Sequence, residues 1–456
     1  MARALGYGIV LSLPATPGRA HVSEQGFVLL LPTDLYIAGG VATVVLTIAL
    51  ILFLPGSATL GLFRPLHIPA GNAPRLAGLT RWVAAGLLLA LLVCGVAGAP
   101  DPLANPLPLW VWTVTWIGLV SVQGALFNIW GFVDPFRAPG ACLRRVISRR
   151  LHLRLPRAAG KWPAVVLLVA FAAFMLADPA PADPRRLALI VALYAAMTVA
   201  GRAVFGPRWA LQVEFLTVMM RLFASVAPLS RSAAGLWGWR LARGASPDPA
   251  LAVFAVALLG IGSFDGLNET FWWLGRIGIN PLEYPGRSAV IGATLIGLAL
   301  VLAGLLAAFA LSLGAGLLLA RRAGFLRAFC AFAPALLPIA TGYHIAHYLT
   351  SFLVDIQWTL AATSDPLDTG ADLLNLGQFY VTTGFFNTRD TVRIIWLTQA
   401  GAVVIGHVIS ILVAHAIALR IYGNDRAALL SQAPLAVLMV LYTLFGLWLL
   451  ASPRGV

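Results

Sequence analysis

Long apolar stretches recur along the whole chain, and each is long enough to cross a bilayer as a helix, which takes about 20 residues. Only 11% of the 456 residues are charged and 60% are hydrophobic, whereas about 25% of the residues of soluble domains are charged. The sequence therefore predicts an all-α, polytopic helical bundle embedded in a lipid bilayer. We place ten transmembrane helices near residues 35–54, 81–99, 109–132, 163–180, 187–204, 249–264, 289–319, 330–354, 394–419 and 433–451.

The first residues have the pattern of a secretory signal peptide. In "MARALGYGIVLSLPATPGRAHVS", Arg3 precedes a short apolar core that ends among small residues, as in cleavable signals. Cleavage after Ala20 would leave His21 as the first residue of the mature protein. We therefore expect a signal peptide at 1–20 and one transmembrane domain at 21–456, with an uncleaved N-terminal anchor as the alternative.

The basic residues predict the orientation. The loop 136–161 is strongly basic, which places it in the cytoplasm of a bacterial inner membrane protein. Counting spans from that loop puts the loops 265–288 and 355–393 outside, provided that 209–230 does not cross. We expect an interfacial amphipathic segment over 209–247. The net charge of +14 comes from such arginine-rich loops, so no nucleic acid partner is expected.

Two buried histidines stand out in "TGYHIAHYLT", inside the predicted span 330–354. His344 and His347 share one helix face, and His407 of the next span lies at a similar depth. Asp355, at the outer end of the span, is a candidate to orient or join them. Ionisable groups at such depth usually face the bundle interior or a wet cavity. Neutral packing between helices, a proton relay, and ligation of Zn, Cu or haem all fit this pattern.

A second group of polar residues lies in "GSFDGLNETFWWLGRIGIN". Asp265 ends a span, Gly266 allows a bend, and Glu269 follows four residues after Asp265. The pair could provide hard oxygen ligands or an acid and a base. Asp265 could equally cap a helix. Residues 270–279 are too few to cross, so we expect a re-entrant or interfacial helix there.

A terminal His21 would add a metal site of its own. Its free amine and imidazole form a two-nitrogen chelate that suits copper, and His347 is the outermost buried histidine and therefore its expected partner.

Several sequence fragments resemble a family of bacterial membrane proteins named for fenitrothion hydrolase. These are "LPTDLYIAGG", "FDGLNETFWW", "IAHYLTSFL", "TSDPLDTG" and "IGHVISILVAH", and the similarity extends over most of the chain from His21 onward. The resemblance implies hydrolysis of apolar organophosphorus triesters at the inner membrane, together with a related second membrane subunit. No P-loop, GxSxG or HExxH motif is present, so we expect a metal-assisted phosphotriester hydrolase. The alternative is a metal or ion transporter, or a metal- or haem-handling protein, without hydrolase activity.

Overall fold

The computed structural model describes residues 28, 31–69, 74–244 and 247–454. The predicted signal peptide 1–20 and His21 lie outside the described residues. Within them the chain is almost entirely helical, and its one small sheet pairs β1 (Leu66–His67) with β2 (Ala233–Ala234) in antiparallel register. The all-α fold predicted from the sequence is confirmed.

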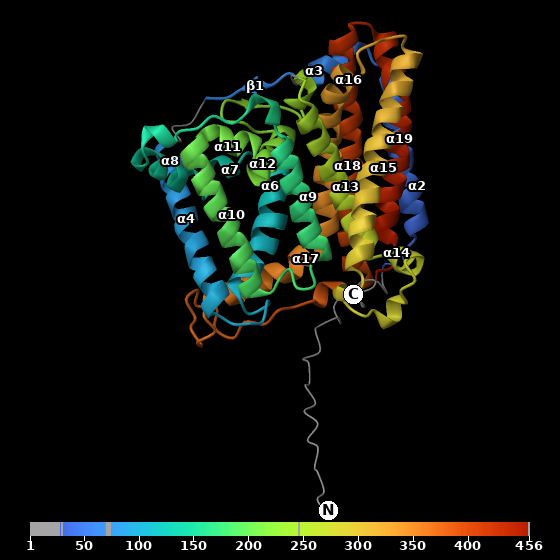
Figure 1. Ribbon diagram of the computed structural model, residues 1–456. Helices are drawn as coiled ribbons and strands as arrows, with labels where there is room; N and C mark the ends of the chain where they lie inside the picture. Colours follow the sequence, from blue (N-terminus) through green and yellow to red (C-terminus); the bar gives the residue numbers. More distant parts are fainter. Residues whose placement is uncertain (1–27, 29–30, 70–73, 245–246, 455–456) are drawn as a thin grey trace, which may run out of the picture.

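Nine helices of the described chain are long and apolar enough to cross a membrane, and they run side by side in one bundle (Figure 1). The tenth predicted span is the shorter apolar helix α9 (Trp162–Ala177). The protein is therefore a multi-pass membrane bundle. The nine are α2 (Thr33–Phe53), α4 (Pro74–Ala97), α5 (Pro106–Leu109) continued by the π-helical η1 (Trp110–Leu119) and α6 (Val120–Ala125), α10 (Pro184–Phe205), α13 (Pro249–Asn268), α15 (Ile291–Leu319), α16 (Phe325–Phe332) continued by α17 (Leu337–Ser364), α18 (Arg389–Tyr422) and α19 (Asp425–Ala451).

Short helices cover the two ends of the bundle. One end, which we call the α8 end, carries α3 (Gly56–Leu62), α8 (Arg137–Val146) and α16 (Figure 1). The opposite end, called the α14 end, carries α14 (Phe271–Arg276) and the C-terminus. The predicted short helix after residue 270 therefore exists and lies at an end of the bundle.

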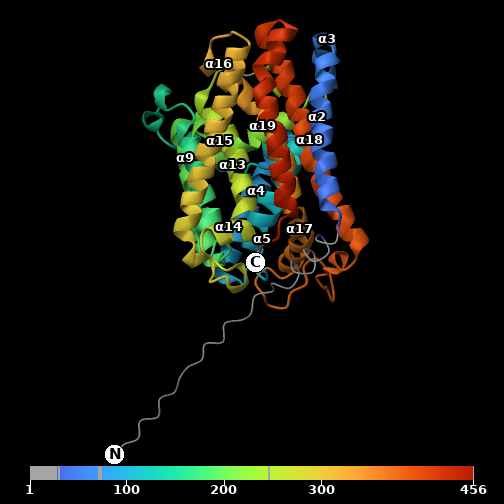
Figure 2. The same cartoon turned by 90° about the vertical axis from the view of Figure 1, so that its right-hand side faces the viewer.

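The helices that carry Asp265 and the buried histidines, α13, α17 and α18, lie at the centre. In an apolar window of 18 residues, 83% of the residues are buried in the segments containing α13 and α17 and 72% in α18, compared with only 11% in α2 on the periphery (Figure 2). Glycines let α17 and α18 approach closely: a Cβ on Gly342 would overlap the carbonyl oxygen of Ala402, and one on Gly406 would lie 2.6 Å from that of Pro338. Small residues at such contacts are typical of tightly packed membrane helices.

The segment 209–230 differs from the predicted surface helix. It forms α11 (Pro207–Gln212) and α12 (Phe215–Val226), and nine of the twelve residues of α12 are buried, against α6, α9 and α17. Glu214, which had suggested an interfacial position, is itself buried and paired with Arg202. Most of α12 is therefore buried against its neighbours, and the charge of Glu214 at its start is neutralised inside the protein rather than by solvent. The position of 209–247 at the membrane interface stays a prediction.

Two predicted loops begin later than expected. Helix α13 continues to Asn268, so Asp265 and Gly266 are helical and Gly266 makes no bend. Helix α17 continues to Ser364, so Asp355 lies inside the helix rather than in a loop. Asp265 and Asp355 therefore do not show where their helices end, because both helices continue beyond them.

Candidate functional site

Asp265 and His347 meet at the contact between α13 and α17. His347 Nε2 lies 3.0 Å from Asp265 Oδ2, and the hydroxyl of Tyr348 donates to the same carboxylate oxygen. Both Asp265 and His347 are buried. The sequence indicated these residues as two separate groups, and the structure brings them into one, which we call the Asp265–His347 pair.

The second ring nitrogen of His347 is left without a partner. When Nε2–H donates to Asp265, the neutral ring carries a lone pair on Nδ1, and neither Nδ1 nor the hydroxyl of Tyr343 has a hydrogen-bond partner in the described chain. The two rings are stacked, with centroids 5.7 Å apart and planes 8° apart. Buried polar atoms of this kind usually have a partner, such as an ordered water.

Gly266 explains the space beside these two atoms. A Cβ at this position would overlap the Tyr343 hydroxyl and would lie 3.6 Å from His347 Nδ1. Both unpartnered atoms therefore face the same point on α13. The glycine keeps that point free for the side chains of α17.

His344 has a different environment. Its Nε2 lies 2.9 Å from the carbonyl oxygen of Trp116, in the π-helical segment η1. Its ring also meets the edge of the Trp116 ring, with centroids 5.5 Å apart. If His344 is neutral and donates to this carbonyl, its Nε2–H is satisfied by a hydrogen bond between helices. This geometry fits the interpretation from the sequence in which a neutral histidine packs between helices.

A small pocket opens between these side chains. Its volume is about 30 Å³, and its polar lining comes from Trp116, Tyr343, His344, His347 and Tyr348, with apolar residues of α9, α12 and α13 around them. A cavity needs about 10–15 Å³, measured in the same way, to hold one water molecule. The pocket therefore suits water and is too small for a drug-sized ligand, which needs about 300 Å³ or more.

His407 lies apart from this pair. Its Nδ1 is 2.9 Å from the carbonyl oxygen of Val403 on its own helix, and its Nε2 has no partner in the described chain. Its aromatic neighbour is Tyr442, with ring centroids 6.4 Å apart, and the hydroxyls of Tyr442 and Ser263 form a hydrogen bond. His407, on α18, therefore lies beside this second polar contact, which joins α13 and α19.

The predicted metal ligands do not form a single site among the described residues. No three His, Cys, Asp or Glu side chains there are grouped so as to hold a metal ion. Asp355 lies eight residues beyond His347 on α17, about 12 Å along a helix, and no hydrogen bond or ion pair in the described chain joins it to a histidine. The set His344, His347, His407 and Asp355 therefore does not form one metal-ion site in this structure, and His21 lies outside the described residues.

Glu269 does not join Asp265. It follows the end of α13, its side chain is 38% exposed, and it lies 4.0 Å from Arg454. Asp265, by contrast, faces the bundle interior. The two carboxylates are therefore not an acid/base pair, because the helix ends between them and their side chains have separate partners.

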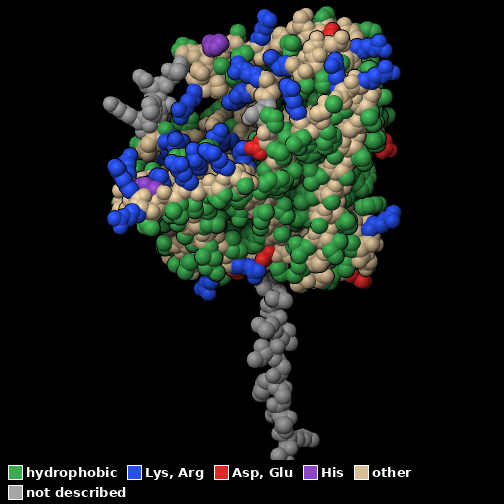
Figure 3. Space-filling view, turned by 45° about the horizontal axis from the view of Figure 1, so that its top comes forward, with side chains coloured by type: hydrophobic (Ala, Val, Ile, Leu, Met, Phe, Trp, Pro, Cys, Tyr) green, Lys and Arg blue, Asp and Glu red, His purple; other side chains and the backbone are tan. Residues whose placement is uncertain are grey.

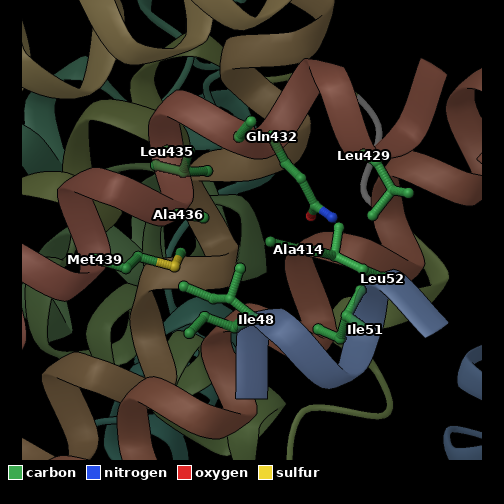
Figure 4. A pocket seen from close by; sticks show the side chains of 11 residues that line it. Ile48, Ile51, Leu52, Ala414, Leu429, Gln432, Leu435, Ala436 and Met439 are labelled. Carbon is green, nitrogen blue, oxygen red and sulfur yellow. The ribbon is translucent and has the colours of Figure 1, made fainter. Parts of the chain in front are cut away.

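A second pocket, of about 60 Å³, lies between α2, α18 and α19 (Figure 4). Its lining is apolar except for Gln432, whose amide lies 2.5 Å from His415 Nδ1. This contact satisfies His415 and is separate from the Asp265–His347 pair.

Comparisons with known proteins find no match: no family model, no curated protein and no solved structure is similar to the chain. The resemblance to the fenitrothion hydrolase family thus remains an expectation from sequence fragments.

Sequence reasoning missed the two tyrosines as parts of the site. Tyr343 lies four residues before His347, so the two share a helix face, and Tyr348 follows His347 directly. That spacing was a usable signal for Tyr343. No sequence signal pointed to the carbonyl of Trp116 as the acceptor for His344, because Trp116 lies on η1, more than 200 residues before His344 in the chain.

Proposed function

We propose that the protein is a proton-coupled membrane transporter in which the Asp265–His347 pair binds and releases the proton. The observation that carries this proposal is a buried carboxylate–imidazole pair with a free Nδ1 beside a water-sized pocket. Ionisable groups within membrane spans commonly mark proton relays and ion pathways. The ion transporter considered from the sequence is therefore the class that this geometry supports best.

Charge balance explains why such a pair would take up one proton. With Asp265 ionised and His347 neutral, the site carries one net negative charge in a medium of low dielectric constant, which is costly. A proton on Nδ1 gives an imidazolium–carboxylate pair with no net charge. Tyr348 donates to the carboxylate in either state. Water in the pocket would connect Nδ1 with the surroundings.

The basic loops give the orientation that goes with this proposal. Positive residues favour the cytoplasmic side, so the α8 end would face the cytoplasm of a bacterial inner membrane and the α14 end would face outside. The Asp265–His347 pair then lies in the outer half of the bilayer, because α13 reaches Asp265 shortly before its end at Asn268.

Proton binding can be tested without knowing the cargo. Purified protein in weak buffer is subjected to a pH jump, and proton uptake is measured with an indicator dye. Asp265→Asn and His347→Gln should each take up fewer protons than the wild type. His344→Gln is the matched control, since glutamine can also donate to the Trp116 carbonyl. Equal uptake by the wild type and by folded Asp265→Asn would contradict the proposal.

A hydrolase is the second candidate, because an aspartate that fixes one histidine tautomer is also the geometry of a general base. In that reaction Nδ1 of His347 takes a proton from water as its oxygen bonds to the phosphorus of an apolar triester. The bond from phosphorus to the aryl oxygen breaks, and the aryl oxide leaves with the electron pair. The proton then passes from His347 to solvent or to the leaving group. The pocket would have to widen to admit such a substrate.

Proteoliposomes with a nitrophenyl phosphotriester distinguish the two candidates. A hydrolase releases nitrophenol and loses this activity in His347→Gln, whereas a transporter without hydrolase activity releases none above empty vesicles. Elemental analysis and an absorption spectrum of the same preparation test for bound Zn, Cu or haem. We assign no step to a metal, since the described residues do not gather its ligands.

A further inference from the structure

A strongly basic segment projects from the α8 end of the bundle. No aspartate or glutamate occurs between Asp134 and Asp178, while residues 137–161 contain seven arginines and one lysine. We call residues 137–161 the basic arm. Figure 3 shows Lys and Arg side chains gathered on this end of the molecule, next to a surface that is largely hydrophobic.

Six of the seven arginines of the basic arm are exposed. One is Arg137 at its base, and the other five lie farther along the arm and have no acidic partner among the described residues. Among the described residues, no carboxylate lies within ion-pair distance of their side chains, whereas Lys161 pairs with Asp248 and Arg144 donates to the carbonyl oxygens of Ala203 and Val204. The positive charge of these five is therefore directed outward. They are Arg145, Arg149, Arg150, Arg154 and Arg157.

The arm is held in place at the end of a membrane span. Arg144 donates to the last turn of α10, and the backbone N–H of Leu153 donates to the carbonyl oxygen of Val204, at 3.1 Å. Gly140 packs against Arg202 so closely that a Cβ would lie 2.8 Å from that side chain. Because α10 ends at Phe205, these contacts place the arm at the level where the bilayer meets water.

Arg202 fixes the base of the arm from inside the bundle. Its guanidinium donates to Asp134 Oδ2 at 2.7 Å and, through Nε, to Glu214 Oε2 at 2.9 Å. Asp134 also accepts from the backbone N–H of Phe136, at the start of α8. The arm therefore starts from a buried ionic contact and is not a free loop.

Exposed apolar side chains stand among the exposed arginines. Val146 is 78% exposed, and Leu151 and Leu153 are each 55% exposed. Apolar residues beside arginines at this level are typical of segments that lie in the headgroup region. An acidic soluble partner would explain the charge but not these apolar side chains at a membrane boundary.

We propose that the basic arm is a docking surface for anionic phospholipid headgroups. The five arginines would contact the lipid phosphates, and Val146, Leu151 and Leu153 would enter the headgroup layer. Charge attraction to anionic leaflets is known for basic segments next to membrane spans. The surface is independent of the proton site, because it lies at the α8 end and shares no residue with the Asp265–His347 pair.

Lipid preference of the intact protein tests the proposal. The full chain is reconstituted in nanodiscs that contain spin-labelled phosphatidylglycerol or spin-labelled phosphatidylcholine, and the fraction of immobilised lipid is measured. The wild type should prefer phosphatidylglycerol several-fold. A variant with all five arginines replaced by glutamine should lose most of this preference. The five-lysine variant should keep it, because the attraction depends on charge.

A second set of exposed arginines at the α8 end supplies the matched control. Arg321 and Arg322 lie at the turn between α15 and α16, and Arg327 lies in the first turn of α16. Their replacement by glutamine removes charge from the same end and should leave most of the preference. The proposal would be overturned if this control lost its preference for phosphatidylglycerol while the five-glutamine variant kept it. So would a five-lysine variant that behaves like the glutamine variant.

Cys142 offers an independent measurement on the unaltered chain. It is the exposed free cysteine on α8, while Cys94 and Cys330 are buried. An environment-sensitive fluorophore on Cys142 should shift to the blue in nanodiscs with phosphatidylglycerol relative to phosphatidylcholine alone. High salt should reverse the shift, since it screens exposed charges. An emission maximum that is the same in both lipids would also contradict the proposal, and inorganic phosphate alone should produce no shift.

Discussion

Gly266 on α13 faces the hydroxyl of Tyr343 on α17 so closely that a Cβ on the glycine would overlap it. The same point lies 3.6 Å from His347 Nδ1. A single missing side chain thus leaves room for two polar atoms that have no partner in the described chain. The space beside the Asp265–His347 pair therefore depends on residue 266 being a glycine.

Gly266→Ala should therefore disturb the site. The methyl group must push the Tyr343 ring away from α13, and such overpacking costs about 1–3 kcal/mol. We expect a lower melting temperature in detergent and reduced proton uptake after a pH jump.

The double variant Gly266→Ala/Tyr343→Phe separates this contact from general helix effects. Removal of the hydroxyl relieves the overlap, so much of the lost stability should return. Gly292→Ala is the matched control, because a Cβ there meets nothing within 4 Å, and alanine favours the helix by about 1 kcal/mol. No recovery in the double variant would mean that the hydroxyl is not the obstacle.

The sequence predicted the helices well and the partners of the site poorly, for a physical reason. Apolar length alone reveals a membrane span, so each of the ten predicted spans contains a helix. Pairing between helices depends on how they pack, and nothing in the sequence indicates that Asp265 meets His347 rather than Glu269. Glu214 shows the same limit: a charge suggested a surface helix, whereas Arg202 neutralises it inside the bundle.

Asp265→Ala should destabilise the protein far more than Tyr348→Phe. The alanine leaves both His347 Nε2–H and the Tyr348 hydroxyl without their acceptor, and each unsatisfied buried group costs about 1–3 kcal/mol. The phenylalanine removes a single donor, and His347 still has its acceptor. Thermal unfolding of the two variants in one detergent checks this order, and equal melting temperatures would contradict the assigned hydrogen bonds.

Gly342→Ala should separate α17 from α18. The added methyl would overlap the carbonyl oxygen of Ala402, and a backbone atom cannot move aside as a flexible side chain can. We expect a loss of about 1–3 kcal/mol of stability. Gly401→Ala on α18 is the control, since its Cβ has open space and should leave the melting temperature unchanged or raise it.

The segment between α17 and α18 should lose its order in acid. Asp372 accepts hydrogen bonds from the backbone N–H groups of Gly377 and Leu376 and from the hydroxyl of Ser364. These bonds, with that of Gly377 the most important, lower the pKa of Asp372 below its usual value. Asp365 is held similarly, first by the backbone N–H of Thr369, and its pKa is also lowered.

A carboxylate with a lowered pKa contributes stability that is fully present above its unfolded pKa, about 3.9, and that is lost as the pH falls through the folded value. The segment 365–388 should therefore stay ordered down to about pH 4 and open below it. Pepsin, which is active in acid, can measure this as the pH at which cleavage within the segment begins. Asp372→Asn should be cleaved at a higher pH than the wild type, because the neutral amide accepts these bonds less strongly.

Asp368→Asn is the control, since no hydrogen bond to the Asp368 side chain is found in the described chain. Cleavage of the wild type and of Asp372→Asn at the same pH would show that these carboxylate bonds do not hold the segment.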